Sequence, residues 1–134
     1  MSVKRVDPAE AAQLVDEGWI YVDVRSIPEF DQGHPAGAYN LPLLHMSDGR
    51  RTPNADFESV FAASFADKDV KVVLGCRSGA RSLKAATLLT TKGYTNLVDM
   101  RGGFSGDKEC VGWQERGLPV ATVAETGRSW GELS

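Results

Sequence analysis

Cysteine and histidine are scarce in this sequence. Its 134 residues include two cysteines, Cys76 and Cys110, and two histidines. Two thiols are too few for a disulfide framework, and neither lies in a Cys-x-x-Cys pair or near a histidine at the spacing of a zinc site. We therefore expect reduced thiols and no structural metal.

Long apolar runs and clusters of basic residues are also absent. Apolar runs span only a few residues, and Lys4 and Arg5 are followed by Asp7-Pro8 instead of an apolar segment. These features predict neither a membrane span nor a signal peptide, and they favour a cytoplasmic location. The lysines and arginines are scattered and the net charge is −3, so a nucleic acid partner is not expected.

The length and composition are those of one globular domain. The chain is 42% hydrophobic and 25% charged, which is ordinary for a folded protein that buries its own core. We expect a single domain over residues 1–120. Residues 121–134, rich in polar and small side chains, are expected to form a loosely held C-terminal tail.

Strand and helix patterns alternate along the chain. Capping motifs at Asp7 and Ser26 predict helix starts, and apolar residues recur at helical spacing after Phe57 and after Ser82. The alternation predicts an α/β fold with a mainly parallel sheet and helices on both faces. The expected strands are 19–24, 39–41, 70–74 and 97–100, the expected helices are 8–17, 26–33, 57–65, 82–92 and 105–116, and residues 42–54 are expected to form a loop.

The most informative segment is the run Cys76-Arg77-Ser78-Gly79-Ala80-Arg81-Ser82, which lies between an expected strand and an expected helix. In an open parallel sheet, ligands bind beyond the carboxyl ends of the strands. Gly79 lets the amides of residues 77–82 curl inward, and the helix that starts at Ser82 adds its positive end. Because such a site stabilises a thiolate, we predict that Cys76 is a nucleophile.

The remaining residues of this loop receive roles from their positions. We call the hollow formed by the inward-facing amides of residues 77–82 the anion-binding bowl. The Arg81 guanidinium is placed in this bowl with Cys76, as a catalytic group, and Arg77 at its opening, where it meets incoming anions. The other substrate-binding residues are predicted to be Ser78, Gly79, Ala80 and Ser82. Cys110 lies in an expected helix, where a small buried residue is the commoner role than a second reactive thiol.

Several motifs in order resemble the rhodanese family of sulfurtransferases in its single-domain form. They are Asp23-Val24-Arg25, Glu29-Phe30, the run from Gly33 to Pro42, the loop 76–82 and Gly102-Gly103. Each motif is weak alone, but the ordered set is specific and covers nearly the whole chain. The resemblance implies a five-stranded parallel sheet flanked by helices on both faces.

The resemblance also implies a reaction. The Cys76 thiolate would take sulfane sulfur from a small anionic donor such as thiosulfate, release sulfite, and pass the sulfur to cyanide or a thiol. Such covalent catalysis needs no metal or organic cofactor. The partners would be the donor and a thiophilic acceptor, with a protein acceptor as an alternative, and the chain would be a monomer or weak dimer.

Other conspicuous residues are expected to be structural. By analogy with the family, Asp23 and Arg25 join a strand end to neighbouring loops, and His34 lies in a packed turn. Two segments depart from the commonest family pattern: the polar insert at 104–110 and the tail beyond Pro119. The insert is expected to affect the shape of the wall near the bowl, and the tail is a candidate contact surface for a partner.

Three alternative functions remain. The first is a persulfide carrier or partner-binding module with little turnover of its own. The second is a non-catalytic module on the same scaffold, and the third is a cysteine phosphatase or arsenate reductase. Retention of Cys76 argues against a non-catalytic module. In the phosphatases five residues separate cysteine and arginine, whereas Cys76 and Arg81 enclose four, so the ring is tighter and better suited to sulfur.

Overall fold

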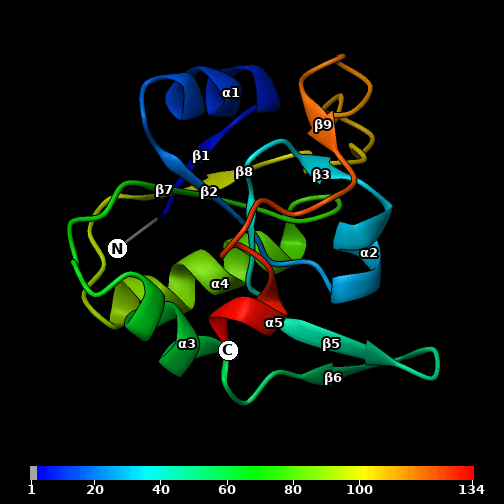
Figure 1. Ribbon diagram of the computed structural model, residues 1–134. Helices are drawn as coiled ribbons and strands as arrows, with labels where there is room; N and C mark the ends of the chain where they lie inside the picture. Colours follow the sequence, from blue (N-terminus) through cyan, green and yellow to red (C-terminus); the bar gives the residue numbers. More distant parts are fainter. Residues whose placement is uncertain (1–2) are drawn as a thin grey trace.

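A five-stranded parallel sheet forms the centre of the molecule in the computed structural model, which describes residues 3–134 (Figure 1). The strand order is β1-β8-β7-β2-β4. The residues of β7 and β8 are all buried, as expected where helices cover both faces of a parallel sheet. The strands are β1 (Lys4–Val6), β2 (Ile20–Asp23), β4 (Tyr39–Asn40), β7 (Val72–Gly75) and β8 (Leu97–Met100). The predicted fold class is confirmed.

Helices cover the two faces of this sheet unequally. In Figure 1, α1 (Pro8–Asp16) lies above the sheet, and α3 (Phe57–Ser64), α4 (Ala80–Thr91) and α5 (Trp130–Leu133) lie below it. On the lower side, Phe57 and Phe61 of α3 pack in one core cluster with Leu89 of α4 and with sheet residues. On the upper side, Ala11 of α1 packs in a second cluster that includes Trp113.

The two predicted capping motifs begin helices as expected. Asp7 Oδ1 accepts a hydrogen bond of 2.8 Å from the Glu10 N–H at the start of α1. At the start of α2 (Ile27–Gln32), Glu29 Oε1 accepts from the Ser26 N–H at 3.2 Å and from the Ser26 hydroxyl at 2.8 Å. Because these bonds satisfy amide groups that a helix start leaves unpaired, local sequence suffices to place both helices.

The loop predicted for residues 42–54 is wrong, because most of it forms a β-hairpin. Strands β5 (Leu44–Ser47) and β6 (Arg50–Pro53) pair antiparallel around the turn Asp48-Gly49. Both turn residues have positive φ, 50° and 74°, and Asp-Gly is a strong signal for a two-residue hairpin turn. The strand pattern itself is hidden because the residues of β6 are exposed and polar enough to resemble a loop.

The helix predicted for residues 105–116 is also wrong, because this segment consists of turns. The Asp107 side chain accepts hydrogen bonds from the backbone N–H groups of Glu109 and Cys110, both at 2.8 Å, and such bonds compete with helix formation. Gly106 and Gly112 bring two backbone segments together, since a Cβ at Gly112 would lie 2.3 Å from Gly106 N.

The C-terminal residues return to the sheet. Strand β9 (Val120–Ala121) pairs antiparallel with β3 (His34–Pro35). Further on, the Arg128 carbonyl accepts from the Asn40 N–H at 2.9 Å, and Trp130 packs against the core. The domain boundary at residue 120 stays a prediction, but residues 121–134 contain regular elements and bond to β4. No helix within residues 3–134 combines the length and the apolar character that crossing a membrane requires.

Candidate active site

Cys76 directly follows β7, at the carboxyl end of the sheet. Its side chain is 2% exposed. The Gly79 N–H donates to Cys76 Sγ at 3.1 Å, and the Cys76 thiol donates to Ser82 Oγ at 3.4 Å. Gly79 adopts φ of 109° at the N-cap of α4, a conformation that favours glycine. The predicted strand, turn and helix are therefore present, although the helix begins at Ala80 instead of Ser82.

The Arg81 guanidinium contacts a carboxylate of a neighbouring helix. Its Nη1 and Nη2 donate to Glu29 Oε1 and Oε2 at 2.7 and 2.9 Å, which is the bidentate geometry that arginine and carboxylate favour. Burial raises the pKa of Glu29, but the bonds from Arg81 and Ser26 and the charge of Arg81 outweigh it and bring the pKa to about 2. The Glu29 hydrogen bonds raise the pKa of Arg81. Arg81 thus enters the site as half of an ion pair, and its role in the bowl stays a prediction.

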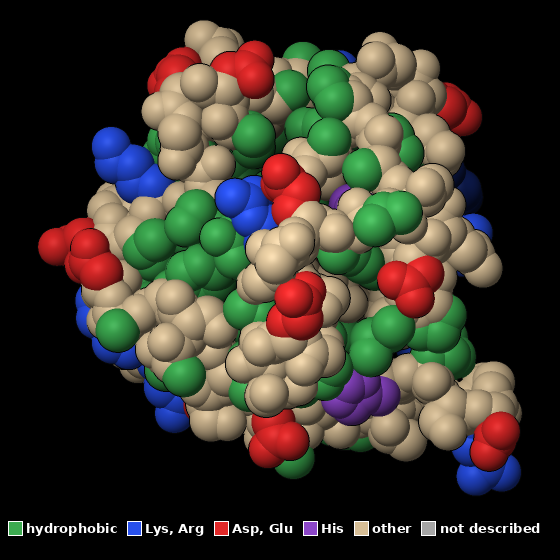
Figure 2. Space-filling view, in the orientation of Figure 1, with side chains coloured by type: hydrophobic (Ala, Val, Ile, Leu, Met, Phe, Trp, Pro, Cys, Tyr) green, Lys and Arg blue, Asp and Glu red, His purple; other side chains and the backbone are tan. Residues whose placement is uncertain are grey.

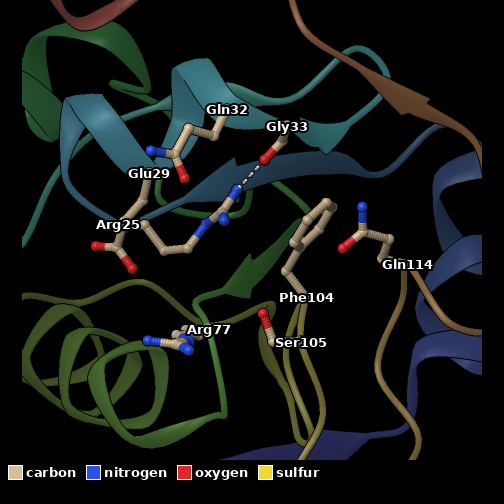
Figure 3. Close-up of a pocket in the computed structure, with 8 residues that line it drawn as sticks. All are labelled: Arg25, Glu29, Gln32, Gly33, Arg77, Phe104, Ser105 and Gln114. Atoms are coloured by element: carbon tan, nitrogen blue, oxygen red, sulfur yellow. Dashed lines mark hydrogen bonds between the residues drawn. The ribbon is translucent and has the colours of Figure 1, made fainter.

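Residues 76–82 are called the reactive loop below. Arg77 lines a cavity of about 360 Å³ beside this loop (Figure 3). Two amide side chains, Gln32 and Gln114, lie at opposite sides of this cavity. The lining is mostly polar and combines residues of α2, of the reactive loop and of the segment after β8. Its residues are Arg25, Glu29, Gln32, Gly33, Arg77, Phe104, Ser105 and Gln114. The insert at 104–110 therefore contributes two wall residues, Phe104 and Ser105.

Arg25 joins the end of β2 to a neighbouring loop, as expected, and its side chain also lines the cavity. Arg25 Nη2 donates to Asp23 Oδ2 at 2.7 Å and to the Gly33 carbonyl at 2.6 Å, and its guanidinium lies 4.5 Å from the centre of the Phe104 ring. Burial lowers the pKa of Arg25, but the charge and hydrogen bonds of Asp23, together with the charges of Tyr21 and Glu29, outweigh burial and raise the pKa above its usual value. Arg25 thereby connects the end of β2 with Gly33 and Phe104, two other residues that line the cavity.

His34 and Cys110 also lie in packed surroundings. The His34 ring is 1% exposed, stacks on Phe30 with ring centres 3.7 Å apart, and places Nδ1 2.8 Å from the Phe30 carbonyl oxygen. His34 is thus packed as expected, but it lies on the short strand β3 and not in a turn. Cys110 is 6% exposed, its thiol lies 3.7 Å from the Arg101 carbonyl oxygen, and it receives a contact from Arg116 Nη2 at 3.7 Å.

The turn Gly102-Gly103 supports the reactive loop from behind. A Cβ at Gly103 would lie 2.4 Å from the carbonyl carbon and oxygen of Arg77, so the backbones touch. The next two amides, of Phe104 and Ser105, donate to the carbonyls of Cys76 and Arg77 at 2.8 and 2.9 Å. The sequence showed a sharp turn here but not its contact with the loop, since no local pattern encodes it.

Two further residues at the site, Arg5 and Asp99, escaped sequence reasoning. Arg5 Nε donates to Asp99 Oδ2 at 2.6 Å, and the Ser82 hydroxyl donates to Asp99 Oδ1. They are 94 positions apart, so only knowledge of the strand order brings them together. Among residues 3–134 there is no group of three or more His, Cys, Asp or Glu side chains that could hold a metal ion.

A parallel sheet with a strand-end cysteine, a glycine turn and a following helix is the architecture expected from the family resemblance. The rhodanese-like domain model matches residues 7–110, and the chain belongs to this family. It is 38% identical over 110 residues to thiosulfate sulfurtransferase 16, chloroplastic, of Arabidopsis thaliana, covering 82% of this chain and 86% of the relative.

Other relatives agree with this assignment. Thiosulfate sulfurtransferase GlpE of Haemophilus influenzae is 32% identical over 123 residues, covering 92% of this chain and 99% of the relative. The crystal structure of Rv0390 from M. tuberculosis has a TM-score of 0.73 and 28% identity, covering 92% of this chain and 100% of that one. Two longer plant relatives are matched over 56% and 57% of their length.

Proposed function

We propose that this protein is a sulfurtransferase that carries sulfane sulfur as a persulfide on Cys76. The observation that carries the proposal is the bond of 3.1 Å from the Gly79 N–H to Cys76 Sγ, at the start of the twelve-residue helix α4. A backbone donor and the positive end of a helix favour a negatively charged sulfur. Relatives named thiosulfate sulfurtransferase in a plant and a bacterium support the same reaction class.

The proposed reaction has two displacements at sulfur. In the first, the Cys76 thiolate attacks the outer sulfur of thiosulfate; a new S–S bond forms, the S–S bond of thiosulfate breaks, and sulfite leaves with the electron pair. In the second, cyanide or a thiolate attacks the terminal sulfur of the persulfide, and the Cys76 thiolate leaves. The thiolate is regenerated without a redox cofactor.

The charges around the cavity refine the choice of donor. Arg81 is paired with Glu29, so the two arginines of the loop do not contribute equally to the positive charge that a dianionic donor meets. Arg77, which is exposed and lines the cavity, supplies the positive charge that an approaching anion meets. Preorganised donors such as the Gly79 amide cost little reorganisation during reaction. We keep thiosulfate as the proposed donor, with Arg77 as its principal cation.

The test is sulfur loading followed by unloading. Incubation with thiosulfate is expected to add the mass of one sulfur atom to the intact protein, and cyanide is expected to remove it as thiocyanate. Cys76→Ser should gain no mass, whereas Cys110→Ser, the matched control, should gain as much as the wild type. Absence of a gain, or an equal gain in Cys76→Ser, would contradict the proposal.

Turnover separates the enzyme from the alternative of a persulfide carrier. Rapid formation of thiocyanate from thiosulfate and cyanide supports an enzyme that acts alone, whereas a stable persulfide with slow turnover supports a carrier. Comparing thiosulfate with 3-mercaptopyruvate tests the donor. Phosphate-ester hydrolysis that depends on Cys76 would instead support the phosphatase alternative. A cytoplasmic location belongs to the proposal and is tested by cell fractionation.

A further inference from the structure

A closed ring of hydrogen bonds passes through the reactive cysteine and two residues without an assigned role. The Cys76 thiol donates to Ser82 Oγ, and the Ser82 hydroxyl donates to Asp99 Oδ1. Arg5 Nε donates to Asp99 Oδ2 at 2.6 Å, and Arg5 Nη2 donates to the Gly79 carbonyl at 3.3 Å. The Gly79 N–H closes the ring on Cys76 Sγ. The sulfur is thus connected in both directions to Arg5.

The ring joins two neighbouring parallel strands to the loop that follows β7. Arg5 lies on β1 and Asp99 on β8, and these two residues are partners in the register of the strands. The Asp99 side chain is fully buried, whereas the Arg5 side chain is 40% exposed. Burial raises the pKa of Asp99, although the bonds from Ser82 and Arg5 act in the opposite direction. A buried carboxylate with so few partners depends on each of them.

The direction of the bonds matters for the sulfur. A serine hydroxyl has one proton, and Asp99 accepts it because its oxygen lies much closer than the alternative acceptor, the Gly79 carbonyl at 3.4 Å. Ser82 therefore presents a lone pair to the Cys76 thiol. A thiolate or persulfide anion would be stabilised by the opposite arrangement, in which Ser82 donates to sulfur. Asp99 therefore competes with the sulfur for the proton of Ser82.

We propose that Asp99 and Arg5 are positioning residues of the reactive loop: Asp99 sets the orientation of the Ser82 hydroxyl against Cys76, and Arg5 connects Asp99 to the Gly79 carbonyl. The role rests on the proposed function of Cys76, but the ring itself is tested on the free thiol. Within the ring, neither residue bonds to Cys76 directly, and both act through Ser82 and Gly79.

Other charged or titratable groups also face Cys76 and must be held constant. Tyr21 of β2 lies against Gly75, where a Cβ would meet the tyrosine hydroxyl, and the pKa of Tyr21 is raised well above its usual value, mainly by burial. Arg81 lies on α4 and Arg77 in the loop, and the charge of Cys76 acts on Arg81. The variants below leave these three groups intact.

The first experiment measures alkylation of Cys76 by iodoacetamide against pH in a Cys110→Ser background. In Asp99→Asn, the amide oxygen is expected to face Arg5 and the amide NH₂ to face Ser82, so that Ser82 donates to sulfur. The midpoint should move to lower pH by about one unit, since an anion is lost and a donor gained. In a Ser82→Ala background the same substitution should have less than half this effect. An unmoved midpoint, or an equal shift without Ser82, overturns the proposal.

The second experiment tests Arg5 without changing charge. Arg5→Lys keeps a cation but removes the fork that reaches both Asp99 and Gly79. Amide hydrogen exchange of Gly79, followed by NMR, should accelerate by about tenfold or more because the loop opens more readily. Lys4→Ala, at an exposed cation on the same strand, should leave it unchanged. If the exchange of the Gly79 amide is unchanged in Arg5→Lys, the proposal is overturned. This test does not depend on whether Asp99→Asn folds. Neither readout requires a persulfide, so failure of the proposed function would appear separately.

Discussion

Glu29 shows how much one carboxylate contributes at this site. It accepts hydrogen bonds from Ser26 at the start of α2 and from Arg81 at the start of α4. The side chains of the Glu29–Arg81 pair are 19% and 11% exposed, so solvent screens it less than a surface pair. The residue that caps one helix thereby fixes the arginine of the reactive loop.

A pH titration of stability tests this contribution. The folded-state pKa of Glu29, about 2, lies below the unfolded value of about 4.3, so its stabilisation is present above pH 4.3 and is lost as the pH falls through 2. The linked free energy is on the order of 2 to 3 kcal/mol. In urea titrations at several pH values, Glu29→Gln should reduce the loss of stability between pH 4.3 and 2. An unchanged slope would mean that other carboxyl groups dominate.

Arg77 is expected to affect donor binding more than turnover. It lines the cavity and is exposed, so an anionic donor that enters the cavity would meet it before reaction. Arg77→Ala should raise KM for thiosulfate by about tenfold with a smaller change in kcat, because the lost interaction exists before the transition state. Lys71→Ala, at an exposed cation before β7, is the control. A fall in kcat alone would place Arg77 in the transition state instead.

At the scale of elements, the Gly102-Gly103 turn and the reactive loop form one unit. The close approach of Gly103 to the Arg77 carbonyl leaves no room for a side chain, and the two amides that follow hold the loop carbonyls. The conformation of the loop is thus set from behind as well as by its own glycine. The Gly102-Gly103 turn directs the following residues, Phe104 and Ser105, to the wall of the cavity.

Two alanine substitutions separate contact from backbone strain. Gly103 and Gly117 have φ of 63° and 76°, but a Cβ at Gly117 would meet no atom within 4 Å. Gly117→Ala should therefore cost about 1 kcal/mol, from strain alone. Gly103→Ala should cost about 2 kcal/mol more and reduce sulfur loading of Cys76, because the loop must shift. Chemical denaturation measures the loss of stability, and mass spectrometry measures sulfur loading. Equal losses of stability in Gly103→Ala and Gly117→Ala would contradict the supporting contact.

The elements that sequence analysis predicted correctly are those with local signals. Asp7 and Ser26 cap helices through neighbouring residues, and the strand before Cys76 is a short buried run. The hairpin of β5 and β6 was missed because the exposed β6 shows no alternation of apolar and polar residues. The helix expected over 105–116 does not form because Asp107 and two glycines favour turns. Arg5 and Asp99 required the strand order, which no local pattern contains.

At the scale of the whole molecule, the last residues tie the sheet edge to the hairpin. Arg128 Nη1 donates to the Gly37 carbonyl at 2.7 Å, and Trp130 packs edge-on against His45 of β5, with ring centres 5.7 Å apart. On the face shown in Figure 2, Lys and Arg are interspersed with Asp and Glu, which agrees with the low net charge. The C-terminal segment is thus part of the packed structure at the β4 edge.

Removing one tail side chain tests this. Trp130→Ala should lower the free energy of unfolding by about 2 kcal/mol, because a half-buried aromatic residue is lost from the core. Val123→Ala, at a residue of the same segment that is 78% exposed, should change it by less than about 0.5 kcal/mol. Urea denaturation gives both values. Equal, small effects would show that the tail contributes no stability.

The pairing of β1 with β8 has a consequence for the protein during its synthesis. Lys4 pairs with Val98 and Val6 with Met100, so the first strand remains without its neighbour until almost three quarters of the chain has left the ribosome. Contacts so distant in sequence form slowly. The environment of Cys76 depends on both strands through Arg5 and Asp99, and it is therefore completed late. In a nascent chain Cys76 therefore lacks this environment until β1 has paired with β8 at the edge of the sheet.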